Sequence, residues 1–191
     1  MKMYDTFTMD SLKPFRVNKQ IPSRYEKVIL IALAHFPELK HVEIDFVLKK
    51  YHNRPLSAEC PIGAFLQFRH KKKFNVIIRE EAEYPQVHML LKILPPEVQI
   101  GAIARELALI CIMRTRSYFS LLKTRLTEAD IPLNSEMETE VDNVVIEHGL
   151  ATQLFEYANY MKTIPVLPLE VHKPVLRPEA ILLLHNQRLG L

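Results

Sequence analysis

The residue most indicative of chemistry is a glutamate inside an apolar segment, GAIARELALICIM, residues 101–113. Aligned with the pattern H-E-x-x-H, the stretch from Arg105 to Leu109 keeps the glutamate, Glu106, and has neither histidine. In that pattern two histidines one helical turn apart bind one zinc ion, and the glutamate between them acts as general base. Glutamate followed by Leu-Ala is common, so this match predicts nothing without its surroundings.

A second acidic segment lies downstream and contains Glu138, Glu140 and Asp142. It lacks the glycine and the ligand spacing of a calcium-binding loop. We therefore interpret residues 136–147 as a helix with one acidic face. His148 follows this helix, and we expect its ring to hydrogen-bond the backbone at the helix end.

Two stretches together resemble a bacterial group of zinc-metallopeptidase-like proteins of the gluzincin type. LPPEVQIGAIARELALI resembles their active-site helix, whose pattern Q-x-G-x-x-x-H-E-L-x-H is matched at Gln99, Gly101, Glu106 and Leu107. EMETEVDNVVIEHGLATQLFEYANYM resembles their second-ligand helix, with matches at Glu140, Asp142, His148, Gly149, Leu150, Gln153 and Leu154. Residues 33–39 and 74–80 also have counterparts, so the resemblance covers residues 24–161.

This resemblance implies a zincin-like fold in which Arg105, Leu109 and Glu140 occupy the former metal-ligand positions. Glu106 would be a vestigial general base, with Asp142 and His148 beside the site. The sequence departs from the family pattern at the two zinc-binding histidines, whose positions are held by Arg105 and Leu109. Neither can bind zinc, because arginine keeps its proton and leucine has no donor atom. Glu106 and Glu140 alone are a poor ligand set for zinc, which favours nitrogen and sulfur. We therefore expect no zinc, no other cofactor and no peptidase activity.

The function expected from this pattern is binding, scaffolding or regulation by a catalytically inactive protein, with a peptide or protein ligand in the old cleft. One alternative is a metal-dependent peptidase or hydrolase that uses non-standard ligands, with Cys111 and the acidic residues 136–142 as suspects. A third interpretation is that the match is coincidental and the chain is an unrelated helical domain.

Arg105 itself predicts what has replaced the metal. Buried carboxylates repel one another without a cation, and a guanidinium bonds carboxylates in a forked geometry. We expect Arg105 to reach Glu140 or Asp142, and Leu109 to fill part of the vacated space. The alternative is an Arg105 that extends into solvent and leaves the carboxylates hydrated. The sequence leaves open which of Glu138, Glu140 and Asp142 faces the site.

The order of elements predicts an α+β class, with a small N-terminal sheet packed on a mainly helical C-terminal part. We expect an extended N-terminal arm over residues 1–23 and one zincin-like domain over 24–191. The expected strands are 41–50, 64–69 and 74–80, with a hairpin turn at 70–73. The expected helices are 24–36, 87–94, 97–115, 117–126, 136–147, 151–161 and 177–188, with an irregular segment at 163–176.

Composition limits the classes of partner. The chain has 191 residues, 48% of them hydrophobic, and a net charge of +3, which is too mild for a dedicated nucleic-acid-binding protein. Its longest apolar runs are far shorter than the roughly 20 residues that cross a membrane, and two cysteines are too few for a disulfide scaffold. We expect a cytoplasmic protein that binds neither membranes nor nucleic acids. Its oligomeric state is not encoded in any recognisable pattern.

Overall fold

The computed structural model describes residues 3–60, 73–84, 86–115, 135–164 and 176–190. Within them lies a four-stranded sheet in the order β1-β2-β4-β3. Its strands are β1 (Lys19–Gln20), β2 (Glu43–Lys49), β3 (Leu56–Glu59) and β4 (Lys73–Arg79). β1 and β4 run parallel to β2, whereas β3 runs antiparallel to β4. The central strand β4 buries residues on both faces, as its apolar run FNVII requires.

Helices make up the rest of the described fold. The longer ones are α3 (Glu26–Ala34), α4 (Pro96–Thr115), α6 (Ser135–Glu147), α7 (Ala151–Thr163) and α8 (Pro178–Leu189). Two short helices, α1 (Met3–Thr6) and α2 (Met9–Leu12), lie near the N-terminus. Single 3-10 turns cover Lys13–Arg16, Ser23–Tyr25, Pro37–Leu39, Gln86–Met89 and Leu91–Ile93.

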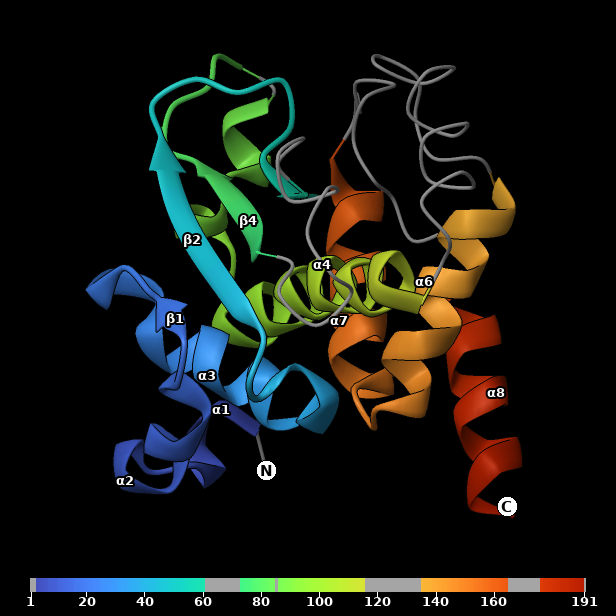
Figure 1. Cartoon of the computed structure of the whole chain (residues 1–191). Helices are drawn as coiled ribbons and strands as arrows, with labels where there is room; N and C mark the ends of the chain where they lie inside the picture. Colours follow the sequence, from blue (N-terminus) through green and yellow to red (C-terminus); the bar gives the residue numbers. More distant parts are fainter. Residues whose placement is uncertain (1–2, 61–72, 85, 116–134, 165–175, 191) are drawn as a thin grey trace.

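α4 is the central helix of the molecule. It lies between the sheet and the group α6, α7 and α8 (Figure 1), and it contacts α3, β3, α6 and α7. A helix surrounded in this way is apolar on nearly all sides, which explains why its sequence shows no polar face. Arg105 and Glu106 are therefore buried charged residues in the middle of the core.

Gly101 permits the close crossing of α4 and α7. A Cβ atom at this position would lie 2.2 Å from the backbone carbonyl oxygen of Gln153, well inside van der Waals contact. Gly149 separates α6 from α7 with a φ of 77°, the left-handed conformation that commonly ends a helix. These two glycines set how α4, α6 and α7 meet.

The structure confirms the α+β class, the small N-terminal sheet and the mainly helical C-terminal part. The predicted strands at 41–50 and 74–80 correspond to β2 and β4, and the four helices expected at 97–115, 136–147, 151–161 and 177–188 correspond to α4, α6, α7 and α8. The strand at 64–69, most of the turn at 70–73, the helix at 117–126 and most of the segment 163–176 lie outside the described residues. No helix in the described ranges has the length and apolarity needed to cross a membrane.

The N-terminal residues do not form the extended arm that the sequence suggested. Residues 3–20 form α1, α2, a 3-10 turn and the edge strand β1. Leu12 is completely buried, and the backbone N–H of Tyr4 donates to Oε1 of Glu97 at 2.9 Å. A few apolar side chains, Leu12 among them, anchor this segment to the core, and their spacing follows no helical or strand period that the sequence could reveal.

Three smaller predictions also change. Residues 87–94 form two 3-10 turns rather than one helix, and the helix expected at 24–36 begins as a 3-10 turn and ends at Ala34. Lys73, assigned to a hairpin turn, is the first residue of β4. β3 was not predicted, because four residues with Leu-Ser-Ala-Glu carry too little pattern to reveal a strand.

Candidate functional site

The side chain of Arg105 crosses from α4 to α6 and meets two carboxylates. Its Nε donates to Oδ1 of Asp142 at 2.8 Å, and its Nη2 donates to Oε2 of Glu138. Glu138 and Asp142 stand one helical turn apart on α6 and therefore share a face. Arg105 is 3% exposed and Asp142 is 0% exposed, so this ion-pair cluster belongs to the core.

The electrostatics keep the guanidinium charged. Burial by itself lowers the pKa of Arg105, but the neighbouring carboxylates of Asp142 and Glu138 raise it above its ordinary value. Burial raises the pKa of Asp142, while Arg105 and the backbone N–H of Leu176, 3.1 Å from Oδ2, act in the opposite direction. Both oxygens of Asp142 thus have donors, as a buried carboxylate requires.

Glu106 turns toward the sheet and has a structural partner there. Its Oε2 accepts the backbone N–H of Ala58 in β3 at 2.6 Å, and the residue is 5% exposed. β3 pairs with β4 on one side only among the described strands, so this amide would otherwise lack a sheet partner. Glu106, to which the resemblance assigns the role of general base, therefore ties α4 to the edge of the sheet.

Leu109 and Glu140, the other two positions to which the resemblance assigns metal ligands, occupy different surroundings. Leu109 lies one turn beyond Arg105, is 8% exposed and belongs to the hydrophobic core. Glu140 is half-buried and lies about 200° around α6 from both Glu138 and Asp142. The expected contact of Arg105 with Asp142 is present, and Glu138, rather than Glu140, supplies the second carboxylate.

A small cavity adjoins this cluster. Arg105, Glu106, Leu56, Tyr157 and Met161 contribute to its lining, and its volume is about 20 Å³, enough for roughly one water molecule. Burial raises the pKa of Tyr157 to about 12, so its hydroxyl stays protonated at neutral pH. Because the cavity holds only about one water, the space next to Glu106 is too small for a peptide side chain as the described residues are arranged.

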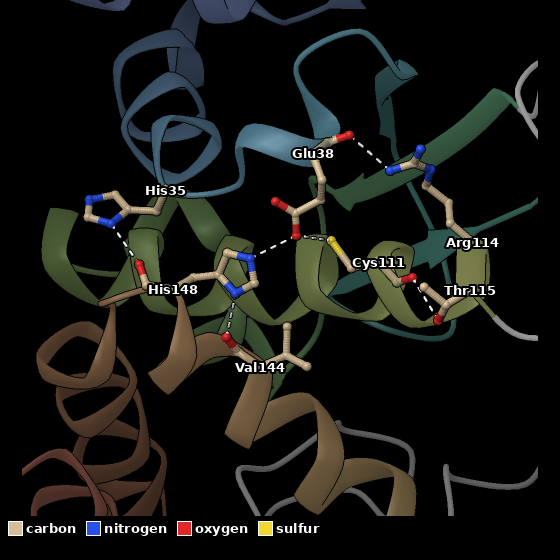
Figure 2. Close-up of polar contacts among 7 residues, drawn as sticks. All are labelled: His35, Glu38, Cys111, Arg114, Thr115, Val144 and His148. Atoms are coloured by element: carbon tan, nitrogen blue, oxygen red, sulfur yellow. Dashed lines mark hydrogen bonds and ion pairs between the residues drawn. The ribbon is translucent and has the colours of Figure 1, made fainter. Parts of the chain in front are cut away.

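His148 forms part of a separate polar cluster with Glu38 and Cys111 (Figure 2). Its Nδ1 lies 2.7 Å from the carbonyl oxygen of Val144, as expected for a helix-end histidine, and its ring stacks on Phe36. Its Nε2 lies 2.7 Å from Oε1 of Glu38, in the 3-10 turn η3 (Pro37–Leu39). Nothing in the sequence links these two residues, because 110 positions separate them.

Cys111 belongs to this cluster and not to the acidic face of α6. Its Sγ donates to Oε1 of Glu38 at 3.2 Å (Figure 2). Burial and the Glu38 carboxylate raise the pKa of the Cys111 thiol well above its usual range. A thiol without its anion is a weak nucleophile and a weak metal ligand. Cys111 and residues 136–142, the suspected alternative ligands, are thus not brought together.

Zinc, the metal that the resemblance implies, does not fit the donors present. Arg105 and Leu109 offer no lone pair, and the carboxylates of Glu106, Glu138 and Asp142 already bond to N–H groups. Across the described ranges, no three His, Cys, Asp or Glu side chains are arranged to hold a metal. Comparisons with models of protein families, with curated proteins and with solved structures find no match to this chain.

Proposed function

We propose that this chain is a catalytically inactive, metallopeptidase-like protein that acts by binding a peptide or protein rather than by hydrolysis. The observation that carries the proposal is the buried guanidinium of Arg105 between Glu138 and Asp142. A positive group stands between two helices at the position that the resemblance gives to a zinc-binding histidine.

Arg105 supplies the positive charge of a metal ion without its chemistry. In a zinc site the metal neutralises nearby carboxylates and polarises a water. Arg105 neutralises Glu138 and Asp142 in the same way, but it has no vacant coordination position and cannot activate water. This substitution preserves the packing of α4 on α6 while removing the chemistry. Retention of a well-packed fold without the reaction favours a binding role.

We place this role in the cytoplasm, where the two free thiols, Cys60 and Cys111, would remain reduced. The partner would contact the surface of β3 and α7, which flank the cavity at Arg105, since the cavity itself holds only about one water.

Restoring the ligands tests the proposal. In the Arg105→His, Leu109→His double variant we expect about one zinc per chain after purification without a metal-affinity tag, measured by elemental analysis. Glu138 and Asp142 face this position, so Glu138→Ala or Asp142→Ala in the same background should reduce zinc binding. Glu140→Ala serves as the matched control and should leave it unchanged.

The native chain provides the decisive comparison. We expect neither bound zinc nor hydrolysis of a mixed peptide library, followed by mass spectrometry, with or without added zinc. Stoichiometric zinc together with peptide cleavage by the native chain, both abolished by Glu106→Gln, would contradict the proposal. A restored variant that stays folded but binds no zinc would show that α4 and α6 never formed a metal site.

A further inference from the structure

A second hollow, independent of the proposed function, lies on the other side of α7. Its walls come from α1, the start of α4 and α7, and its volume is about 760 Å³, within the range of small-molecule sites. α7 presents Tyr157 and Met161 to the small cavity at Arg105, but Gln153, Glu156 and Tyr160 to this hollow. The two spaces are therefore separated by the helix.

The described lining is acidic. Asp5, Glu97 and Glu156 contribute carboxylates, and no lysine or arginine is among the described lining residues, although the whole chain has a net charge of +3. Asp5 and Glu156 are exposed and form no ion pair with any residue that the structure describes. Lys27 contacts the ring of Tyr4 but does not line the hollow. The hollow thus favours a positively charged occupant.

Gln153 provides an independent observation. Its side chain lines the hollow, and the residue is only 3% exposed. Its Nε2 donates to Oε2 of Glu97 at 2.9 Å, and Glu97 accepts the N–H of Tyr4 through its other oxygen. Because a carboxylate only accepts, the amide cannot be flipped. Oε1 of Gln153 therefore faces away from Glu97 and is a buried acceptor with no hydrogen-bond donor.

We propose that this hollow binds the primary ammonium group of an organic amine. The ammonium would donate to Oε1 of Gln153 after a small opening of the wall, and would be neutralised by Glu156 and Asp5. An ammonium offers three donors and no acceptor, which matches the unsatisfied Oε1 of Gln153 and the exposed carboxylates of Glu156 and Asp5. An anion or a neutral alcohol lacks either the charge or the donors. The amine is a free diamine or the side chain of a lysine in a peptide.

Calorimetric titration of the whole chain tests this site. The probes are 1,5-diaminopentane and N-acetyl-lysine methylamide, with 1,5-pentanediol and glutarate as neutral and anionic controls. We expect saturable binding of the amines alone, still measurable at about 0.15 M salt. Tighter binding of the lysine derivative would identify a peptide as the source, and tighter binding of the diamine a free amine. Binding of neither amine, or equal binding of pentanediol, would overturn the proposal.

Matched variants separate a specific site from general charge. We expect Asp5→Asn, Glu156→Gln to weaken amine binding by about tenfold, because two charge-assisted contacts are lost. Asp10→Asn, Glu147→Gln removes the same charge from exposed positions outside the hollow and should change binding less than about twofold. Gln153→Met, with its thermal midpoint measured as a fold control, should also weaken binding. Equal losses in both double variants would contradict the proposal.

Discussion

At the scale of single residues, the fold depends on compensating charges placed inside an apolar core. Arg105 is almost fully buried on a helix that is otherwise hydrophobic, and such a charge is tolerated only with partners. Asp142 and Glu138 supply them from the next helix. Removing one member of such a cluster is more damaging than replacing all of it, because it leaves the others buried and uncompensated.

Arg105→Met should lower the free energy of unfolding by about 3–5 kcal/mol, since it removes the guanidinium that bonds to both buried carboxylates. Urea denaturation followed by circular dichroism measures this loss. The triple variant Arg105→Met, Glu138→Gln, Asp142→Asn should recover much of it, because no charge remains to be compensated. An unchanged stability in Arg105→Met would mean that the guanidinium is solvated and the carboxylates are hydrated.

Glu38 predicts a pH dependence at the second polar cluster. Burial acts to raise its pKa, but its own backbone N–H, Cys111 and His148 lower it overall. A carboxyl whose pKa is lower when folded contributes stability above its unfolded pKa, about 4.3, and loses it as the pH falls through the folded value. Glu38→Gln should therefore be less stable than the native chain at neutral pH.

Measured by urea denaturation at a series of pH values, this difference should shrink below a pH of about 4. Glu83→Gln removes an exposed carboxylate that forms no ion pair with a described residue, and it serves as the control. A gap between native chain and Glu38→Gln that stays constant from neutral to strongly acidic pH would contradict the interpretation.

At the scale of elements, the crossing of α4 and α7 is set by one glycine. Gly101→Ala should gain about 1 kcal/mol from helix propensity but lose more from the clash with the carbonyl of Gln153. We expect a net destabilisation of roughly 1–3 kcal/mol in urea denaturation. The test is the sign of the change in the free energy of unfolding, because replacing a surface glycine in a helix by alanine would increase stability.

Gly190→Ala is a suitable comparison for this clash. Gly190, unlike Gly101, has space around it for a Cβ, with no atom within 4 Å, and only its φ of 72° opposes the substitution. Its cost should be at most about 1 kcal/mol because it lies at the end of α8. If Gly101→Ala were as mild as Gly190→Ala, the two helices would not be in close contact.

At the scale of the whole molecule, the N-terminal residues and the C-terminal helices share one core around α4. Leu12 is completely buried, and α1 contacts both α3 and α4. A shared core predicts a single cooperative unfolding transition, with coincident curves from tyrosine fluorescence and circular dichroism.

Leu12→Ala should shift both curves together and lower the free energy of unfolding by about 2–5 kcal/mol. Leu183→Ala, at a side chain that is 60% exposed, should change it by less than about 0.5 kcal/mol. An N-terminal segment that unfolds by itself would instead produce two transitions, with the second one unaffected by Leu12→Ala.

The sequence by itself determined the local features of this protein. The sequence predicted the helices α4 and α7 and, from the alternation of apolar and polar residues, the strand β2. It also indicated that a buried Arg105 needs a carboxylate partner. These inferences hold because helix and strand periods, and the cost of burying a charge, act within a few residues of the chain.

Only the tertiary structure decided which groups meet. The rotation of α6 about its own axis brings Glu138 and Asp142, rather than Glu140, to Arg105 on α4. The position of β3 beside α4 supplies a backbone N–H for Glu106. The pairing of Glu38 with His148 and the docking of the N-terminal segment likewise join residues far apart in the chain. Such contacts arise from packing of the whole core, and no local pattern of residue types records them.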